Sequence, residues 1–198
     1  TKRLDTELQA LQGTNPTLES NAVALQMLAE GEAWKTRFEA AAPHFAKLSQ
    51  NGVMSDEISV RSAALHRSLD NPAAAIAIEE HLDRSTPLDT AARTRIGEIH
   101  ADRERFAEAK AVWDRIPQLQ PGNEDRYLEA ATLYWDYFQF DDALRQLQAA
   151  RDRKRDQNLF AYEEGAIQEN KRQYAQAIAA YVKGAVNGNE PSRNRLLQ

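Results

Sequence analysis

The chain has 198 residues, of which 42% are hydrophobic and 28% charged, a balance typical of a folded rather than a disordered protein. Its formal net charge of −5 argues against a general nucleic-acid binder, because neutralising phosphates requires a surplus of Lys and Arg. It contains no cysteine, which excludes disulfides, thiolate nucleophiles and sulfur ligands for metals.

The sequence predicts an all-helical chain. No segment alternates apolar and polar residues with Val, Ile and Thr predominating, so no strand is expected. Ala, Leu, Glu, Gln and Arg fill runs of about a dozen residues, which predicts short helices. Such usage of Ala, Arg and Gln is also typical of bacterial proteins. Turns are expected at clusters of Gly, Asn and Pro, at residues 13–16, 51–52, 71–72, 85–87, 121–123 and 187–189.

The first part of the chain, residues 1–55, is expected to form an N-terminal helical segment in which Pro43 breaks one helical run. The chain opens on Thr1 and carries no apolar stretch after it, so no signal peptide is predicted. Nor is a membrane span expected, since the longest apolar run, residues 73–78, is far shorter than about 18 residues. The sequence leaves open whether residues 1–55 are divergent repeats or an irregular cap.

Between residues 90 and 190 the sequence repeats itself every 34 residues. Small residues fall on small ones and bulky apolar residues on bulky ones, without a gap. Two helices pack closely where a Gly or Ala faces the crossing point and a large side chain fills the space beside it. The shift aligns Gly97 with Ala131 and Gly165, Phe106 with Phe140 and Tyr174, Ala109 with Ala143 and Ala177, Trp113 with Leu147 and Tyr181, and Ile116 with Ala150 and Gly184.

This pattern resembles the tetratricopeptide repeat (TPR). Its elements are a small residue early in helix A, an aromatic before helix B, an Ala three residues later, an aromatic four beyond that, and a closing Pro. In the first clear unit these are Gly97, Phe106, Ala109, Trp113 and Pro121. The resemblance implies a solenoid of antiparallel helix pairs in a right-handed superhelix. The third unit departs from the family at Glu164, where Leu is usual, and at Arg155 and Asn189, which replace the closing Pro.

Upstream, residues 56–84 are expected to be a degenerate repeat, so that TPR-like units extend over residues 56–190. Shifting back by 34 places Ala63 under Gly97 and Ala75 under Ala109. Pro72 falls where an aromatic is usual, so we expect helix B to begin there with Asn71 as its cap. Residues 191–198 read as the start of a further helix, which suggests that the sequence is part of a longer protein.

Groups that could carry catalysis or bind a metal do not form a recognisable site. The histidines His44, His66, His81 and His100 include no pair at helical spacing, and His66 and His100 share one repeat position, which favours packing. No Gly-x-Ser-x-Gly motif or Gly-rich phosphate loop occurs, so neither an enzyme nor a cofactor is predicted. The basic run 151–156 lies at a predicted helix C-terminus, where cations favour the helix dipole.

A second side of helix A is the candidate binding surface. Trp135 lies about 100° around the helix from the core residue Tyr134. In proteins that this chain resembles, that side lines a concave groove, and the resemblance implies the same role here. The positions are Thr94, Glu98, Ala101 and Asp102 in the first clear unit, Leu128, Thr132, Trp135 and Asp136 in the second, and Tyr162, Ala166, Glu169 and Asn170 in the third.

These positions carry four acids and no Lys or Arg, together with Trp135 and Tyr162, which are expected to be exposed. Such a surface suits a basic or apolar peptide. It does not match the Lys and Asn with which some TPR domains hold the terminal carboxylate of chaperones. The leading hypothesis is therefore a protein-interaction scaffold. Three alternatives stay open: solvated helix faces without a ligand, an accessory domain of a larger enzyme, and a module that self-associates through exposed solenoid ends. The compartment, cytoplasm or periplasm, stays open too.

Overall fold

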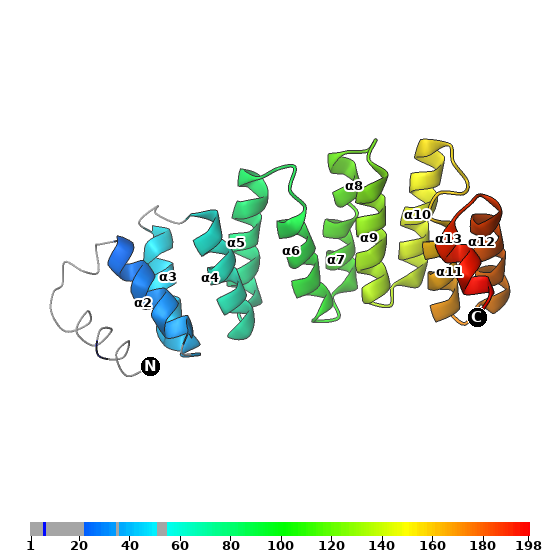
Figure 1. Cartoon of the computed structure of the whole chain (residues 1–198). Coiled ribbons are helices and arrows are strands. Elements are labelled where there is room, and N and C mark those ends of the chain that lie inside the picture. The colour runs from blue at the N-terminus through cyan, green and yellow to red at the C-terminus, as the bar shows by residue number, and fades with distance from the viewer. Residues whose placement is uncertain (1–5, 7–21, 35, 51–54) are drawn as a thin grey trace. The chain divides into compact units, whose positions relative to one another are not determined.

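The computed structural model describes Thr6 and residues 22–34, 36–50 and 55–198. Within these residues helices are the only regular secondary structure, as expected (Figure 1). It divides into two compact units, Thr1–Thr86 and Pro87–Gln198. The helices are α2 (Ala22–Trp34), α3 (Phe38–Gln50), α4 (Asp56–Ser68), α5 (Pro72–Ser85), α6 (Ala91–Ala101), α7 (Phe106–Trp113), α8 (Ile116–Leu119), α9 (Glu124–Asp136), α10 (Phe140–Lys154), α11 (Ala161–Asn170), α12 (Tyr174–Val186) and α13 (Glu190–Leu196).

Consecutive helices pair into hairpins (Figure 1). The first unit holds α2–α3 and α4–α5, and the second holds α6–α7, α9–α10 and α11–α12, followed by α13. The turns expected near residues 71, 86, 122 and 188 all lie between helices, whereas those at 13–16 and 51–52 lie outside the described residues. The division expected from the repeats, into residues 1–55, 56–190 and 191–198, stays a prediction.

The close approach of helices α6 and α7 confirms the role expected of Gly97. A Cβ placed on Gly97 would lie 2.0 Å from Nε1 of Trp113, a residue that is fully buried. The ring of Trp113 in turn packs edge-on against Tyr134, with 5.3 Å between ring centroids. The α11–α12 hairpin repeats the arrangement, because a Cβ on Gly165 would lie 2.4 Å from the ring of Tyr181. The small and large residues found by the 34-residue shift therefore do meet in space.

Helix α5 begins where the sequence predicted. Pro72 occupies its first turn, where the missing N–H is not needed by the helix. The side chain of Asn71 accepts a hydrogen bond from the backbone N–H of Ala74 at 3.3 Å and so caps the helix.

The expectation that Pro43 breaks a helix is wrong, because Pro43 lies inside α3. Ala41, Phe45 and Leu48, on both sides of it, are buried against residues of α2. Pro43 itself is exposed and near the start of the helix, so the single hydrogen bond that it removes is outweighed by this packing.

Residues 22–50 follow the same 34-residue register as the rest of the chain. Ala29, at the position of Gly97, and Ala41, at that of Ala109, are fully buried. Phe45 stands at the position of Trp113 and is buried as well. The α2–α3 hairpin is therefore built as the later hairpins are, a point that the sequence alone had left open.

The turn between the two helices of each hairpin has one recurring feature, a residue with a positive φ. These residues are spaced by 34, and none of them is a glycine. They are Thr36, Asp70, Glu104, Phe138 and Arg172, with φ between 51° and 61°. The turn geometry therefore repeats even where the residue type does not.

Two departures from the regular repeat have local causes. Pro117 cannot donate a backbone hydrogen bond, so the second helix of its hairpin is interrupted after Trp113 and resumes as α8. Glu164 stands where the family usually has Leu because it forms an ion pair with Arg151 at 2.8 Å. Arg151 is only 3% exposed and also donates to the backbone oxygen of Leu159 at 2.9 Å. The basic run 151–156 thus ends α10, as predicted, and its first member is a buried structural residue.

Candidate protein-binding surface

The structure brings the residues of the expected groove onto the first helices of three hairpins, α6, α9 and α11. Ala101 is buried, so its assignment to an accessible surface is wrong. Ala166 is half-buried. We call the remaining ten residues the helix A face. Asp102, Thr132, Asp136 and Asn170 are exposed, and Thr94, Glu98, Leu128, Trp135, Tyr162 and Glu169 are half-buried.

The two aromatic residues of the helix A face are more buried than the sequence suggested. Trp135 packs against the core cluster around Trp113 and leaves only part of its surface to solvent. The ring of Tyr162 lies 5.8 Å from that of Tyr181 on α12. Side chains held in this way are pre-oriented, which lowers the entropy lost when a ligand binds to them.

Three acids of the helix A face lie at the C-terminal ends of their helices. Asp102 is the C-cap of α6, Asp136 is the last residue of α9, and Glu169 is the last but one of α11. The helix dipole places partial negative charge at this end, so a carboxylate there is disfavoured by about 0.3–1 kcal/mol. The C-terminal end of each of these helices therefore carries the negative charge of a carboxylate in addition to the partial negative charge of the helix dipole.

Two of these acids have protein partners. Asp102 accepts a hydrogen bond from the hydroxyl of Tyr137 at 2.8 Å. Glu169 accepts one from the hydroxyl of Tyr181 at 2.9 Å and forms an ion pair with Arg195 of α13. Hydrogen bonds from Arg195 and then Tyr181 hold the pKa of Glu169 below its usual value. Burial and the bond to Glu169 raise the pKa of Tyr181 to about 12.

Arg195 is a residue that the sequence did not reveal. It belongs to none of the three aligned units, so the repeat shift assigns it no role. Its position means that one of the four acids of the helix A face is already neutralised within the chain. Negative charge is therefore weaker around Glu169 than around the exposed carboxylate of Asp136.

A hollow of about 490 Å³ lies in the first unit, between α2, α3 and α4. Its wall includes Trp34, which is 82% exposed, and Glu30, which forms an ion pair with Arg61 at 2.7 Å. Shifted by 34 and 68 residues, Glu30 corresponds to Ala64 and Glu98, and Trp34 to Ser68 and Asp102. These are helix A face positions, and the same shift applied to residues 22–50 would have found them.

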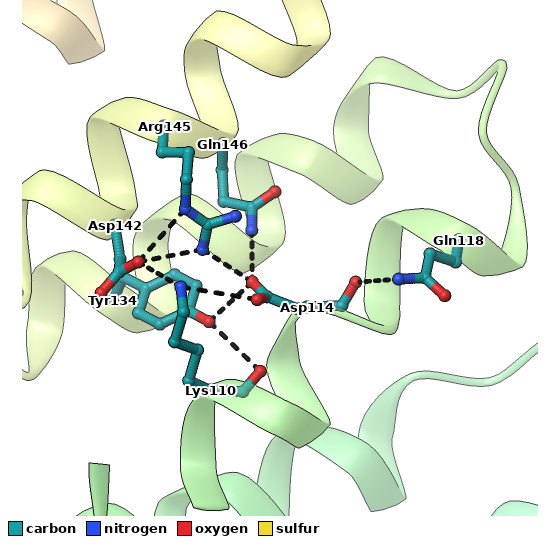
Figure 2. Close-up of polar contacts among 7 residues, drawn as sticks. All are labelled: Lys110, Asp114, Gln118, Tyr134, Asp142, Arg145 and Gln146. Atoms are coloured by element: carbon teal, nitrogen blue, oxygen red, sulfur yellow. Dashed lines mark hydrogen bonds and ion pairs between the residues drawn. The ribbon is translucent and has the colours of Figure 1, made fainter. Parts of the chain in front are cut away.

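A polar cluster connects α7, α9 and α10 of the second unit (Figure 2). Its centre is Asp114, whose Oδ1 accepts hydrogen bonds from the hydroxyl of Tyr134 at 2.8 Å, from Arg145 at 2.8 Å and from Gln146 at 2.7 Å. Lys110 forms ion pairs with Asp114, at 3.5 Å, and with Asp142. The cluster joins two successive repeats. The 34-residue shift does not predict it, because the shift aligns Asp114 with Gln148 and Val182, which are not acidic.

The pKa values in this cluster follow from its burial and pairing. Burial, and then the hydrogen bond to Asp114, raise the pKa of Tyr134 well above its usual value. Burial pushes the pKa of Asp142 upward, but hydrogen bonds from Lys110 and Arg145 outweigh this effect and leave the pKa lowered. Each donor therefore meets an acceptor, which is the arrangement of a structural junction rather than of a reactive site.

His66 and His100 are half-buried at corresponding positions of α4 and α6, and burial lowers the pKa of His66. In the part of the chain that the structure describes, no group of three or more His, Asp or Glu side chains is placed to hold a metal ion. No helix among residues 22–34, 36–50 and 55–198 is both long and apolar enough to cross a bilayer.

Comparison with solved structures identifies the architecture. YrrB, described as a TPR protein with an unusual peptide-binding site, superposes with a TM-score of 0.52 at 20% identity, over 79% of this chain and 80% of that one. MamA gives a TM-score of 0.53 at 14% identity, over 87% and 94% of the two chains. The chain has a TPR-like fold. A tetratricopeptide repeat protein from Parabacteroides merdae gives 0.53 at 16% identity, over 91% of this chain and 72% of its own.

No family model matches the sequence, and no curated protein matches it. The TPR-like fold therefore rests on the three-dimensional arrangement of the helix pairs and on the 34-residue register. In such a fold the stacked helix pairs form an extended surface.

Proposed function

We propose that this chain binds a basic or apolar segment of another protein on its helix A face and has no catalytic role. The observation that carries the proposal is the placement of Asp102 and Asp136 at the C-terminal ends of α6 and α9. Glu169 holds the same place on α11, but Arg195 already neutralises it. Helix dipoles disfavour acids there, so these residues do not serve the stability of their helices. A cationic ligand would benefit from the carboxylates and from the dipoles together.

The half-buried aromatics beside these acids supply the apolar part of the proposed surface. Trp135 immediately precedes Asp136, and its ring is held against the core while part of it meets solvent. Aromatic side chains of this kind are frequent anchors of interfaces, where truncation removes about 2 kcal/mol or more of binding free energy. The hollow beside Trp34, at the same repeat positions of the first unit, is a separate place where an apolar side chain of a bound protein would fit.

A pull-down from a cell lysate, with the retained proteins identified, tests the proposal. Trp135→Ala and Asp136→Lys should both fold and both lose the retained partner. Asp136→Lys is a sharp variant because a cation at the end of α9 suits the helix dipole, so loss of binding would not reflect a weaker helix. Gln148→Lys, at an exposed position of α10, is the matched control and should bind normally. If the partner binds both test variants with unchanged affinity, the helix A face is not the site.

Self-association is a second candidate function, favoured by the exposed apolar residues of α12, which include Ile178 and Val186. An apolar surface of this kind is typical of a protein–protein contact. An accessory role beside the catalytic part of a larger enzyme stays an alternative, and a full-length sequence would test it.

A further inference from the structure

Helix α12 carries a row of exposed apolar side chains. Tyr174, Ile178, Val182 and Val186 are 60%, 55%, 45% and 80% exposed. Their spacing of four residues places them along one side of the helix. We call these four residues the α12 stripe. Lys183 is the only charged residue of this helix, although 28% of the whole chain is charged. A helix so apolar is normally covered by other protein.

The corresponding side of an earlier helix is a junction between repeats. Shifting Ile178 and Val182 back by 68 residues gives Lys110 and Asp114. In the second unit these two residues contact Asp142 and Gln146 of α10, the second helix of the next hairpin (Figure 2). The side of α7 that carries Lys110 and Asp114 is therefore the side that packs against α10. On α12 the polar contact residues are replaced by apolar ones, and they are exposed.

A hollow of about 500 Å³ adjoins the N-terminal half of the α12 stripe. Tyr174, Ala177 and Ile178 of α12 form one wall, and Leu196 of α13 forms another. The polar end of the hollow is closed by the ion pair of Glu169 with Arg195, so its charges are already paired within the chain. The hollow therefore suits an apolar side chain better than a charged one.

We infer that the α12 stripe is the interface of a homodimer, in which α12 of one copy packs antiparallel against α12 of a second copy. This inference rests on the self-association candidate above and not on the helix A face. The stripe is symmetric about residue 180, so an antiparallel pair places Ile178 of one copy against Val182 of the other, and Tyr174 against Val186. Rows of side chains spaced by four residues interdigitate in the commonest class of helix packing.

The absence of charge on the α12 stripe also favours a second copy as the occupant. Each chain has a net charge of −5, but the stripe carries none, and Lys183 beside it lies 3.6 Å from Glu164. Two copies therefore meet without placing like charges opposite one another. The exposed Ala175 and Ala179 leave room for close approach of the helices. Four side chains cover less than the roughly 800 Å² per partner of a standard interface, so the dimer is weak and depends on concentration.

Sedimentation equilibrium of the wild-type chain over about 1–300 µM tests the inference, since this range brackets a weak dissociation constant. The apparent mass should rise from 22.3 kDa toward twice that value. Ile178→Lys should stay at 22.3 kDa throughout, because two lysines would be buried against valine. Gln176→Lys, at an exposed position on the opposite side of the same helix, should dimerise as the wild type does.

Mixing two variants tests the antiparallel pairing itself. Val182→Asp should be monomeric alone, as Ile178→Lys is. Together they should form a heterodimer, because the introduced Lys of one copy would face the introduced Asp of the other, while the second pairing site keeps its Ile and Val. Far-UV circular dichroism should show each variant folded, since both side chains are about half-exposed.

Three results would overturn the inference. One is a wild-type mass of 22.3 kDa at every concentration, and another is a dimer that Ile178→Lys leaves intact. The third is a monomeric wild type from which Ile178→Lys removes a different retained protein, because the stripe would then serve another partner. Trp135→Ala should leave the dimer unchanged, so failure of this inference and failure of the helix A face proposal can be told apart.

Discussion

The contact between Gly97 and Trp113 allows a quantitative test of the packing. A Cβ on Gly97 would lie 2.0 Å from Nε1 and 2.4 Å from Cε2 of a fully buried indole, so alanine cannot fit unless Trp113 moves. Overpacking of this kind destabilises by about 1–3 kcal/mol. Movement of the ring would also weaken its hydrogen bond to the backbone oxygen of Thr94, now 3.3 Å long, at about 1 kcal/mol. Against this, alanine is the better helix former by about 1 kcal/mol. Gly97→Ala should therefore lower the free energy of unfolding by about 1–3 kcal/mol.

In a Trp113→Ala background the same substitution should change sign. Without the indole, only the helix propensity remains, and Gly97→Ala should stabilise by up to about 1 kcal/mol. The double-mutant cycle should then give a coupling of about 1–4 kcal/mol, above what independent sites show. Urea unfolding followed by far-UV circular dichroism measures all four proteins. Gly122→Ala is the control, since nothing lies within 4 Å of its added Cβ, and it should change stability by less than about 0.5 kcal/mol. If Gly97→Ala stabilises the wild type as well, Trp113 does not fill the space above Gly97.

Three further predictions concern other parts of the core. Trp113→Ala alone should lower the free energy of unfolding by about 3–5 kcal/mol, and an unchanged melting temperature would contradict the burial of this side chain. Burial and Asp114 raise the pKa of Tyr134, so its neutral form stabilises the fold fully below about pH 10. This contribution is lost as the pH rises further. Urea unfolding above pH 10 should therefore show a smaller loss of stability for Tyr134→Phe than for the wild type. Arg151→Ala should lower the free energy of unfolding by about 3 kcal/mol, because it leaves Glu164 without its buried partner. Adding Glu164→Leu should restore part of that loss. Additive effects of the two substitutions in thermal melts would argue against the ion pair.

Much of the fold could be predicted from the sequence because its signals are local and periodic. The 34-residue shift located the contact of Gly97 with Trp113, and Asn71 before Pro72 located the start of α5. Pro43 misled us because the rule that proline ends a helix is local, whereas the packing of Phe45 and Leu48 against α2 is tertiary. Residues 22–50 were left out of register because only the small and apolar positions repeat there.

The candidate surface was harder to predict than the fold. Helix periodicity gives the direction of a side chain, so the residues of the helix A face were placed on the correct helices. It does not say which neighbours approach them. Burial of Trp135 against the core, and the ion pair of Glu169 with Arg195, depend on contacts between helices that the sequence does not encode by spacing. The α12 stripe was not singled out from the sequence, because only its exposure distinguishes it from a buried row.

The recurring left-handed residue in the hairpin turns has a consequence for engineering the thermal tolerance of this chain. Side chains with a Cβ are disfavoured at positive φ, and Phe138, at 59°, is among the bulkiest that could stand there. Glycine or asparagine at such a position relieves a strain of about 1–2 kcal/mol, although for glycine an entropy cost of about 0.5–1 kcal/mol offsets part of the gain. The five turns are equivalent, and none of their left-handed residues belongs to the helix A face or to the α12 stripe. A more heat-resistant version of the scaffold could therefore be made turn by turn while its recognition surfaces keep their natural sequence.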